Sequence, residues 1–464
     1  MMPTITYDRF DGGLDVRQLS TSADANRLRE LENAFVTTGR TIRKRAGLKR
    51  VGRIQVGTFG LFSGLGKLWT FSTFNAEHLN LPKLLSHAKL DDPFDVGIKR
   101  IVQVEVFQGF LYVVCQYNNG EYRHHYLDGS ASTLIADANC PHTPQIIKNS
   151  SMIFAIKDDV VRFTAVNAAR DWSTSEKAGF LPVSLRQSTS KYPTALGQFE
   201  SNLVVFFEDS AQIWTIDPDP KNHRLTQNVP IGTVYPYSHA NMSSDIFFLS
   251  PAGFRSVAVQ SYTTSLMDND IGSPIDSIIR MAMRDNSIQP RMVYYRGAGQ
   301  LICFIGAEAY VYSYSRSAKI SAWSKWNFPF VIDHVTEHET HLYVRSGNQI
   351  YVFDDMQYTD DGAPIPVLAQ LPYLDARKPS QLKRFMQLDV SAIGDFDISF
   401  LFDPANPDLE TPAISMSGDT RPLPAIPVEV GATNISIKVK HDSNGEFELA
   451  GISLIYQIHG SHNT

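Results

Sequence analysis

The sequence predicts a nearly all-β protein whose largest part is a six- or seven-bladed β-propeller. Three observations support this class. A short apolar strand core recurs at nearly regular intervals, glycine and proline are scattered rather than clustered, and strict alternation of apolar and polar residues begins near the C-terminus. The chain has 464 residues, more than one hydrophobic core usually supports, so a ring of small cores is expected.

The recurring core is a run of about five mostly apolar residues that follows a polar or glycine-containing turn. The second residues of the cores are Leu68, Leu111, Ile153, Val204, Ile246, Ile302 and Leu342. The steps between them are 43, 42, 51, 42, 56 and 40 residues, a period typical of four-stranded propeller blades. One blade could close with strands from both chain ends. A large sandwich, or a pair of stacked β domains, is the alternative, because strand spacing alone does not fix ring closure.

The pattern changes after Pro364-Ile365-Pro366. Apolar and polar residues then alternate cleanly over 398–402, 435–439 and 452–458, as in half-buried antiparallel strands. Several prolines are confined between these strands. We therefore expect the propeller to span residues 57–365 and a small C-terminal β-sandwich domain to span residues 366–464.

Residues 1–56 predict a distinct N-terminal arm. Residues 1–53 hold 11 Lys and Arg against 6 Asp and Glu, so they carry a charge of +5 while the remainder carries −11. Leu28, Leu31 and Phe35 are at helical spacing and predict a short amphipathic helix. A basic alternating run from Thr41 predicts a strand after it. A basic arm on an acidic body indicates an acidic partner, either a neighbouring subunit or nucleic acid.

The basic run supplies the candidate contact residues. They are Arg43, Lys44, Arg45, Lys49, Arg50 and Arg53. These side chains could bind phosphates with salt-dependent affinity, or they could be the exposed face of a strand that docks on an acidic neighbour. Aromatic residues for base stacking are absent from this run, which favours the second interpretation.

No catalytic or metal-binding motif is predicted, and no cofactor. The glycine-rich stretch 57–67 has Leu61 and Leu68 where a phosphate loop needs glycine and a hydroxyl residue, so it indicates a turn between strands. The histidines of 334–341 lack the order of a helical zinc motif and indicate a solvated inter-strand loop. Asp354-Asp355 and Asp360-Asp361 lack the alternating ligands of a calcium loop and are typical of turns.

The sequence shows no membrane span, no signal peptide and no cysteine pattern typical of disulfides or zinc sites. No apolar run reaches the roughly 18 residues that a membrane span needs, and the start of the chain lacks a basic-then-apolar signal pattern. We therefore expect neither membrane insertion nor secretion by a signal peptide. Cys115, Cys140 and Cys303 are odd in number and widely spaced, so free buried thiols are expected.

Several stretches resemble a known family. Residues 10–15 (FDGGLD), 31–34 (LENA) and 39–48 (GRTIRKRAGL) are similar to the start of short-tailed phage proteins known as tail nozzle, tail tubular protein B or packaged-DNA stabilisation protein. Residues 322–329 (AWSKWNFP) resemble the aromatic end of a blade in those propellers. Residues 377–385 resemble the start of their post-propeller β domain.

The resemblance implies a structural virion protein. It implies a homo-hexameric ring below the tail adaptor ring, with a channel that retains double-stranded DNA and conducts it at ejection. It also implies neighbours such as tail fibre or needle proteins, and location in a virion tail that is assembled in the host cytoplasm. It names no catalytic residue. The alternative from a different class is a monomeric β-propeller that binds carbohydrate or protein at its central mouth, with a glycoside-binding or hydrolase variant. The oligomeric state separates the two.

Overall fold

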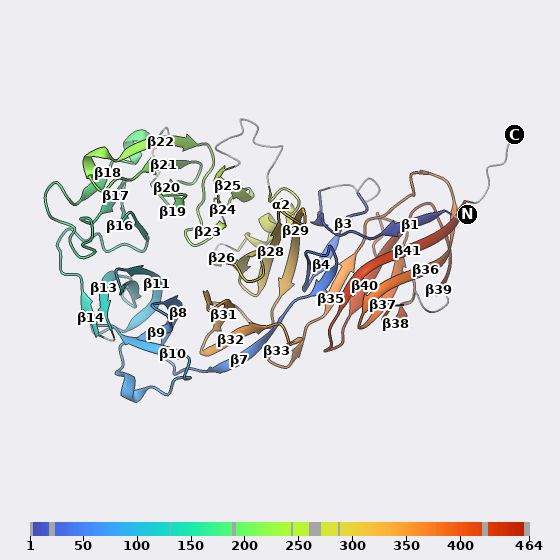
Figure 1. Cartoon of the computed structure of the whole chain (residues 1–464), viewed down its shortest axis with the longest axis horizontal. Coiled ribbons are helices and arrows are strands. Elements are labelled where there is room, and N and C mark those ends of the chain that lie inside the picture. The colour runs from blue at the N-terminus through green and yellow to red at the C-terminus, as the bar shows by residue number, and fades with distance from the viewer. Residues whose placement is uncertain are drawn as a thin grey trace.

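The computed structural model describes residues 3–17, 24–129, 131–187, 192–242, 245–258, 271–285, 288–419 and 426–458. Nearly all of the regular structure in these ranges is β-strand. Figure 1 shows a ring of small sheets, coloured from blue to gold, beside a two-sheet body that contains both the last strands and the first strand. The predicted nearly all-β class is confirmed.

The ring begins with four small sheets that follow one another along the chain. The first is β8 (Phe59–Gly64), β9 (Lys67–Ser72) and β10 (Leu85–Lys89). The second is β11 (Ile98–Phe107), β12 (Phe110–Tyr117), β13 (Tyr122–Asp128) and β14 (Ala131–Leu134). The third is β15 (Ile146–Asn149), β16 (Met152–Lys157), β17 (Val160–Phe163) and β18 (Gly179–Leu181), and the fourth is β19 (Ala195–Phe199), β20 (Asn202–Phe206), β21 (Ala211–Thr215) and β22 (Arg224–Val229).

Three further sheets complete the ring. The fifth is β23 (His239–Met242), β24 (Asp245–Ser250) and β25 (Gly253–Ser256). The sixth contains β26 (Arg291–Tyr295), β27 (Gln300–Ile305), β28 (Glu308–Ser315) and β29 (Ile320–Asn327). The seventh contains β30 (His334–His338), β31 (His341–Ser346) and β32 (Gln349–Asp354). Every predicted strand core is the second strand of one sheet, so the described chain forms seven blades.

The ring is closed on its inner side. The innermost strands β8, β11, β15, β19, β23, β26 and β30 each contact the next one, and β30 contacts β8. The seventh blade takes its fourth strand from the other end of the chain, because β7 (Gly47–Arg53) pairs antiparallel with β32, with Leu48 opposite Phe353. The propeller is therefore closed by an N-terminal strand against a strand more than 290 residues later (Figure 1).

The second body is a β-sandwich. One sheet contains β1 (Thr4–Tyr7), β5 (Ala34–Val36), β6 (Ile42–Lys44), β36 (Lys383–Ile393), β39 (Ile426–Ala432) and β41 (Glu448–Ile458). The facing strands are β4 (Glu30–Glu32), β35 (Val367–Gln370), β37 (Asp395–Leu401), β38 (Ile414–Ser417) and β40 (Ser436–His441). Leu31, Ile42, Phe385, Ile437 and Leu454 are fully buried members of its core.

One continuous sheet joins the two bodies. On its propeller side, β29 pairs in parallel with β4 through Lys325 and Glu32. On its sandwich side, β4 pairs antiparallel with β35, with Leu368 opposite Glu32. The sixth blade and half of the sandwich thus form an eleven-stranded sheet that includes the short strands β2 (Gly13–Leu14) and β3 (Arg27–Leu28). Shared backbone hydrogen bonds fix the sandwich to the propeller.

Two expectations about the N-terminal segment are wrong. Residues 28–35 form β3, β4 and β5 rather than a helix. Residues 1–56 do not form an arm of their own, because β1, β4, β5 and β6 belong to the sandwich and β7 belongs to the propeller. The predicted boundary after residue 365 lies between β34 (Ala363–Pro364) and β35.

Helical structure is minor. The described helices are α2 (Asp276–Ala282) and the 3-10 turns η1 (Ala76–His78), η2 (Ser184–Arg186) and η3 (Pro220–Asn222). Within the described ranges, none of them combines the length and the apolar composition that a membrane-crossing helix needs.

Candidate interaction site at the propeller–sandwich junction

The basic run predicted to make contacts lies where the chain crosses from the sandwich to the propeller. Arg43 and Lys44 belong to β6, Arg45 and Ala46 form the crossing, and Lys49, Arg50 and Arg53 belong to β7. Lys44 and Arg45 are buried, whereas Arg43, Lys49, Arg50 and Arg53 are exposed. The six predicted residues therefore divide into a buried group and an exposed group.

Arg45 is a structural residue. Its side chain is completely buried and faces the carboxylate of Asp360, which is 2% exposed, at 2.5 and 2.9 Å. Its remaining donors reach the Asn33 side-chain oxygen at 3.2 Å and the Asn327 carbonyl oxygen at 2.8 Å. The guanidinium carbon also lies 4.4 Å from the centre of the Phe328 ring. The ion pair and the hydrogen bonds offset the desolvation cost of the two buried charges, and loss of either partner would leave the other charge uncompensated at the junction.

Lys44 is also internal. Its ammonium nitrogen lies 3.2 Å from Nε2 of His441 and donates to the carbonyl oxygens of Ser443 at 2.9 Å and Gly445 at 3.2 Å. Burial, and then the charge of Arg45, lower the pKa of Lys44 to about 8. Lys44 and Arg45 are consequently not available to an external phosphate or subunit.

The other four predicted residues reach the surface. Arg43 pairs with Glu448 at 2.6 Å, Lys49 lies 3.5 Å from Asp354, and Arg50 pairs with Asp361. Arg53 is exposed at the end of β7, and no ion pair to it is found in the described chain. The acidic partner that the sequence predicts for the basic strand is thus partly supplied by this chain itself. Contact of these residues with DNA or with another subunit stays a prediction.

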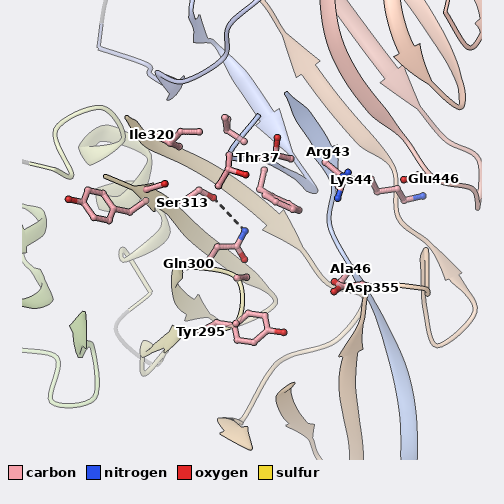
Figure 2. A pocket seen from close by; sticks show the side chains of 18 of the residues that line it. Thr37, Arg43, Lys44, Ala46, Tyr295, Gln300, Ser313, Ile320, Asp355 and Glu446 are labelled. Carbon is pink, nitrogen blue, oxygen red and sulfur yellow. Dashed lines mark hydrogen bonds between the residues drawn. The ribbon is translucent and has the colours of Figure 1, made fainter. Parts of the chain in front are cut away.

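A cavity opens beside this segment (Figure 2). It has a volume of about 430 Å³ and lies between β5 and β6 of the sandwich and the sixth blade of the propeller. Figure 2 shows Arg43, Lys44 and Glu446 on one wall and Tyr295, Gln300 and Ser313 on the other. Both signs of charge line it, since Asp355 and Glu446 accompany Arg43, while the ammonium of Lys44 is held inside by His441, Ser443 and Gly445. The cavity therefore presents polar groups of both signs between the two bodies.

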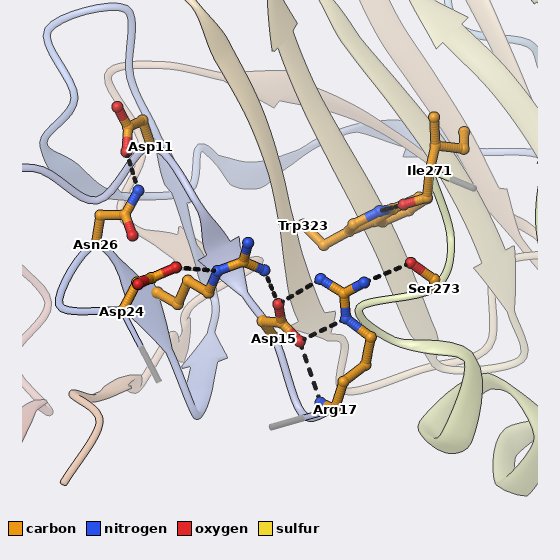
Figure 3. Close-up of polar contacts among 9 residues, drawn as sticks. Asp11, Asp15, Arg17, Asp24, Asn26, Ile271, Ser273 and Trp323 are labelled. Atoms are coloured by element: carbon orange, nitrogen blue, oxygen red, sulfur yellow. Dashed lines mark hydrogen bonds and ion pairs between the residues drawn. The ribbon is translucent and has the colours of Figure 1, made fainter. Parts of the chain in front are cut away.

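A second polar cluster fixes the start of the chain to the propeller (Figure 3). The carboxylate of Asp15 is buried and accepts hydrogen bonds from the backbone and side chain of Arg17 at 2.8 to 3.1 Å, and it also pairs with Arg27. Arg17 in turn donates to the Ser273 hydroxyl at 2.8 Å. The indole of Trp323 donates to the carbonyl oxygen of Ile271 at 2.6 Å. Sequence reasoning missed Asp15 as an organising group, although FDGGLD contains it.

Gly13 is required at the centre of this cluster. Its φ is +55°, and it pairs in parallel with Trp323 of β29. A Cβ atom there would lie 2.7 Å from the Ala322 Cβ atom and 2.8 Å from the Trp323 backbone nitrogen. Both the left-handed conformation and the close approach of the two backbones favour glycine.

The remaining expectations about chemistry can be placed on the fold. Residues 57–67 form the end of a loop and the β8–β9 hairpin, as the turn interpretation predicts. The histidine stretch is not a loop, because 334–338 is the inner strand β30 of the seventh blade. Within the described residues, no group of three or more His, Cys, Asp or Glu side chains is arranged to hold a metal ion. All three cysteines are buried and free, and burial raises the pKa of Cys115 and Cys140 to about 12.

Comparisons with known proteins give likenesses of structure only. No protein-family model matches the chain, and no curated protein sequence matches it. Among solved structures, a chain of the mitotic checkpoint complex is 10% identical, with a TM-score of 0.36, over 76% of this chain and 94% of that one. The BamB protein of Moraxella catarrhalis is 9% identical, with a TM-score of 0.35, and the match covers 66% of this chain and 97% of BamB. The Pan2 WD40 domain of Neurospora crassa is 10% identical, with a TM-score of 0.38, and the match covers 72% of this chain and 96% of the domain. All three TM-scores are below 0.5, so the propeller assignment stands on the strand topology of this chain.

Proposed function

We propose that this chain is a non-catalytic structural protein, a subunit of the nozzle ring of a short phage tail that retains double-stranded DNA and then conducts it. The observation that carries the proposal is the position of the stretches that resemble this family. Four of them, although up to about 310 residues apart, meet at the junction of propeller and sandwich.

The contacts between these stretches are specific. Gly13 of the first pairs with Trp323 of the fourth. Asn33 of the second donates its backbone N–H to Lys325 at 2.8 Å, and its side-chain oxygen accepts from Asn327 at 2.8 Å. Arg45 of the third donates to the Asn327 carbonyl. Short motifs that converge on one buried contact are folding determinants, and a chance likeness of composition would not be expected to assemble in this way.

The junction also suits the mechanical role. A ring that holds DNA under pressure needs walls that do not flex, and a closed propeller presents short protected edges. Here the eleven-stranded sheet ties the propeller to the sandwich by backbone hydrogen bonds. A cyclic ring needs two different surfaces on each subunit that meet head to tail, and the two dissimilar bodies offer such a pair. In this role the protein would be located in the virion tail, below the tail adaptor ring.

The mass of the assembled protein tests this proposal. The full-length chain of 51.9 kDa would be purified and analysed by mass photometry and negative-stain electron microscopy, alone and after incubation with candidate adaptor rings. Rings with six-fold rotational averages are expected in at least one of these conditions. A protein that remains a monomer in all of them, and that is absent from purified tailed particles, would contradict the proposal.

A second candidate is a monomeric propeller that binds a ligand at its axial mouth. It is favoured by a cavity of about 970 Å³ at one end of the ring axis, within the size range of small-molecule sites. A monomer that binds a ligand there would support this candidate over the ring.

A further inference from the structure

The axial end of the propeller is a funnel formed by three adjoining cavities. The largest, about 970 Å³, is lined from the first, second, sixth and seventh blades. A second, about 570 Å³, is lined by the second to fifth blades, and it shares Lys99, Arg100 and Gln289 with the first. A third, about 240 Å³, continues along the inner strands and shares Arg291 and His334 with the first. The shared residues show that the three cavities lie side by side around the axis.

Side chains with N–H donors gather where the inner strands begin. Arg100 lies near the start of β11, Arg291 is the first residue of β26, and His334 is the first residue of β30. Arg345, from the β31–β32 hairpin, lines the same space. In a propeller the innermost strands surround the axis, so residues at their starts converge.

The donors of Arg345 are already engaged within the fold. They reach the carbonyl oxygens of Gly347 and Gly60, each at 2.8 Å, and that of Thr58. Arg345 is therefore structural. Arg100 uses one donor, which reaches the side-chain oxygen of Gln116 at 2.9 Å.

Arg291 differs from both. It is half-buried, and its guanidinium lies over the ring of Tyr237, 5.1 Å from the ring centre. In the described part of the chain no hydrogen bond or ion pair to its side chain is found, although a guanidinium has five donors. Burial, and then the charge of Arg100, lower the pKa of Arg291 from its usual value. An arginine in this position is poorly compensated, and an incoming oxyanion would supply the missing acceptors.

The other groups of the funnel are consistent with an anionic ligand. Burial, and then Arg291, Arg345 and Arg100, hold the pKa of His334 well below its usual value, so its neutral ring can donate one N–H. The nearby acids have partners of their own. Asp333 accepts from the Gly347 backbone at 2.6 Å, and Glu308 pairs with Lys325 at 2.7 Å.

We propose that this funnel binds the phosphate group of a small phosphorylated molecule, with Arg291 and Arg100 as its principal donors and His334 and Lys99 beside them. Two guanidinium groups suit a doubly charged tetrahedral oxyanion, because the planar fork of arginine matches phosphate oxygens in pairs. The remaining space, too large for phosphate alone, would hold the rest of the ligand. This inference does not depend on the tail-ring role, because the funnel lies on the axis of a single propeller.

Isothermal titration calorimetry at low ionic strength tests the proposal on the full-length protein. The probes are glucose 6-phosphate, glucose 6-sulfate, inorganic phosphate and glucose. Binding of glucose 6-phosphate is expected, with weaker binding of phosphate and none of glucose. A preference for the sulfate ester would overturn the assignment to phosphate.

Variants locate the site. Arg291→Gln and Arg100→Gln should each lower the affinity for glucose 6-phosphate at least about tenfold, which corresponds to one lost charged donor. The matched control is Arg224→Gln, which removes an exposed arginine on β22, outside the funnel, and should leave the affinity unchanged. Arg291→Lys retains the positive charge but lacks the planar guanidinium, so it should lower the affinity by an intermediate amount. It provides a test if Arg291→Gln does not fold.

Two results would contradict phosphate binding in the funnel. Failure of the parent protein to bind glucose 6-phosphate, or equal affinity in the parent and both glutamine variants, would exclude the funnel as a phosphate site. Ring formation is measured separately and should be the same in the parent and Arg291→Gln. Loss of binding with intact rings, or intact binding without rings, therefore distinguishes this inference from the proposed tail role.

Discussion

Arg345 donates through Nη1 to the carbonyl oxygen of Gly60 at 2.8 Å, and this hydrogen bond crosses from the last blade of the propeller to the first. A second donor of the same guanidinium reaches the carbonyl of Thr58. Arg345 as a whole is only 5% exposed. Ring closure in this chain thus has two parts: the backbone pairing of β7 with β32 and a buried guanidinium that joins neighbouring blades.

Arg345→Met should open this contact. The substitution keeps much of the side-chain volume but leaves buried carbonyl oxygens without donors, at a cost of about 2–4 kcal/mol in the free energy of unfolding. Thermal and urea denaturation followed by circular dichroism measure it. Arg296→Met, which removes an arginine with an 81% exposed side chain, is the control and should change stability little. Equal stability of the two variants would mean that Arg345 does not hold the ring closed.

The buried pair Arg45–Asp360 is expected to behave cooperatively. Asp360→Asn or Arg45→Met alone leaves an uncompensated buried charge and should destabilise the protein by about 3–5 kcal/mol. The double variant should be less destabilised than the sum of the two single variants, because neither charge then remains. A double-mutant cycle in urea measures the coupling. Additive effects would show that the two side chains do not stabilise one another.

Gly13→Ala tests the contact between the first and fourth family-like stretches. A non-glycine residue at φ +55° costs about 1–2 kcal/mol, and the overlap with Ala322 should add about 1–3 kcal/mol. Gly66→Ala is the matched control, since Gly66 also has positive φ (+70°) but a Cβ there would meet no atom within 4 Å. Limited proteolysis should cut Gly13→Ala near the junction sooner than Gly66→Ala. Equal protection of both variants would remove Gly13 from the junction's determinants.

Glu105 on β11 predicts a specific pH dependence. Burial raises the pKa of Glu105 from 4.5 to about 7. Between these values the folded state holds a proton that the unfolded state releases, so this group lowers the free energy of unfolding as pH rises from about 4.5 to 7. Glu105→Gln should therefore raise the melting temperature at pH 8, by the equivalent of about 1–3 kcal/mol, and by much less at pH 5. The exposed Glu77→Gln is the control. An equal shift at both pH values would exclude titration as the cause.

The propeller could be predicted because its signal is local and repeated. Each blade has one fully enclosed strand, and enclosure on both faces gives the unbroken apolar run that recurs in the sequence. These runs became β9, β12, β16, β20, β24, β27 and β31. Closure could not be predicted from such runs, because it depends on the pairing of Leu48 with Phe353, more than 300 residues apart.

The predicted helix failed for an equally physical reason. The chain bends at Arg29 and again at Asn33, where φ is +55°. Each bend interrupts the two-residue alternation of a strand, so that Leu28, Leu31 and Ala34 all face the core at intervals of three. An interrupted strand and an amphipathic helix then give the same apolar spacing in the sequence.

The interaction site at the propeller–sandwich junction was predicted only in part. Charge density identified the basic run, but burial and partners depend on tertiary structure. The sequence indicates Asp360 only as a turn residue, and it does precede the turn at Asp361 and Gly362. Its carboxylate, however, is the buried partner of Arg45, which is 315 residues away in the sequence. Nothing near Arg45 in the sequence indicates this partner.

These partners also determine how the proposed contact of the basic strand must be tested. Reversing the charge of Lys44 or Arg45 would disrupt the core, and Arg50 pairs with Asp361. Lys49, whose side chain is 63% exposed, has only a contact of 3.5 Å with Asp354, and Arg53 at the end of β7 has no ion pair in the described chain, so these two residues are the least tied to the fold. We therefore expect Lys49→Glu/Arg53→Glu to fold as the parent does, with an unchanged melting temperature.

If the chain forms the proposed ring, this double variant should assemble less completely or retain DNA less well. Single exposed ion pairs contribute only about 0–1 kcal/mol, so reversal of two charges is preferred to their removal. The difference from the parent should be larger at physiological salt than at high salt, where the original contacts are already screened. Ring yield by mass photometry and nuclease-protected DNA in particles measure the two effects. A folded double variant that assembles and protects DNA as well as the parent at physiological salt would show that the outer face of β7 contacts neither a neighbouring subunit nor DNA.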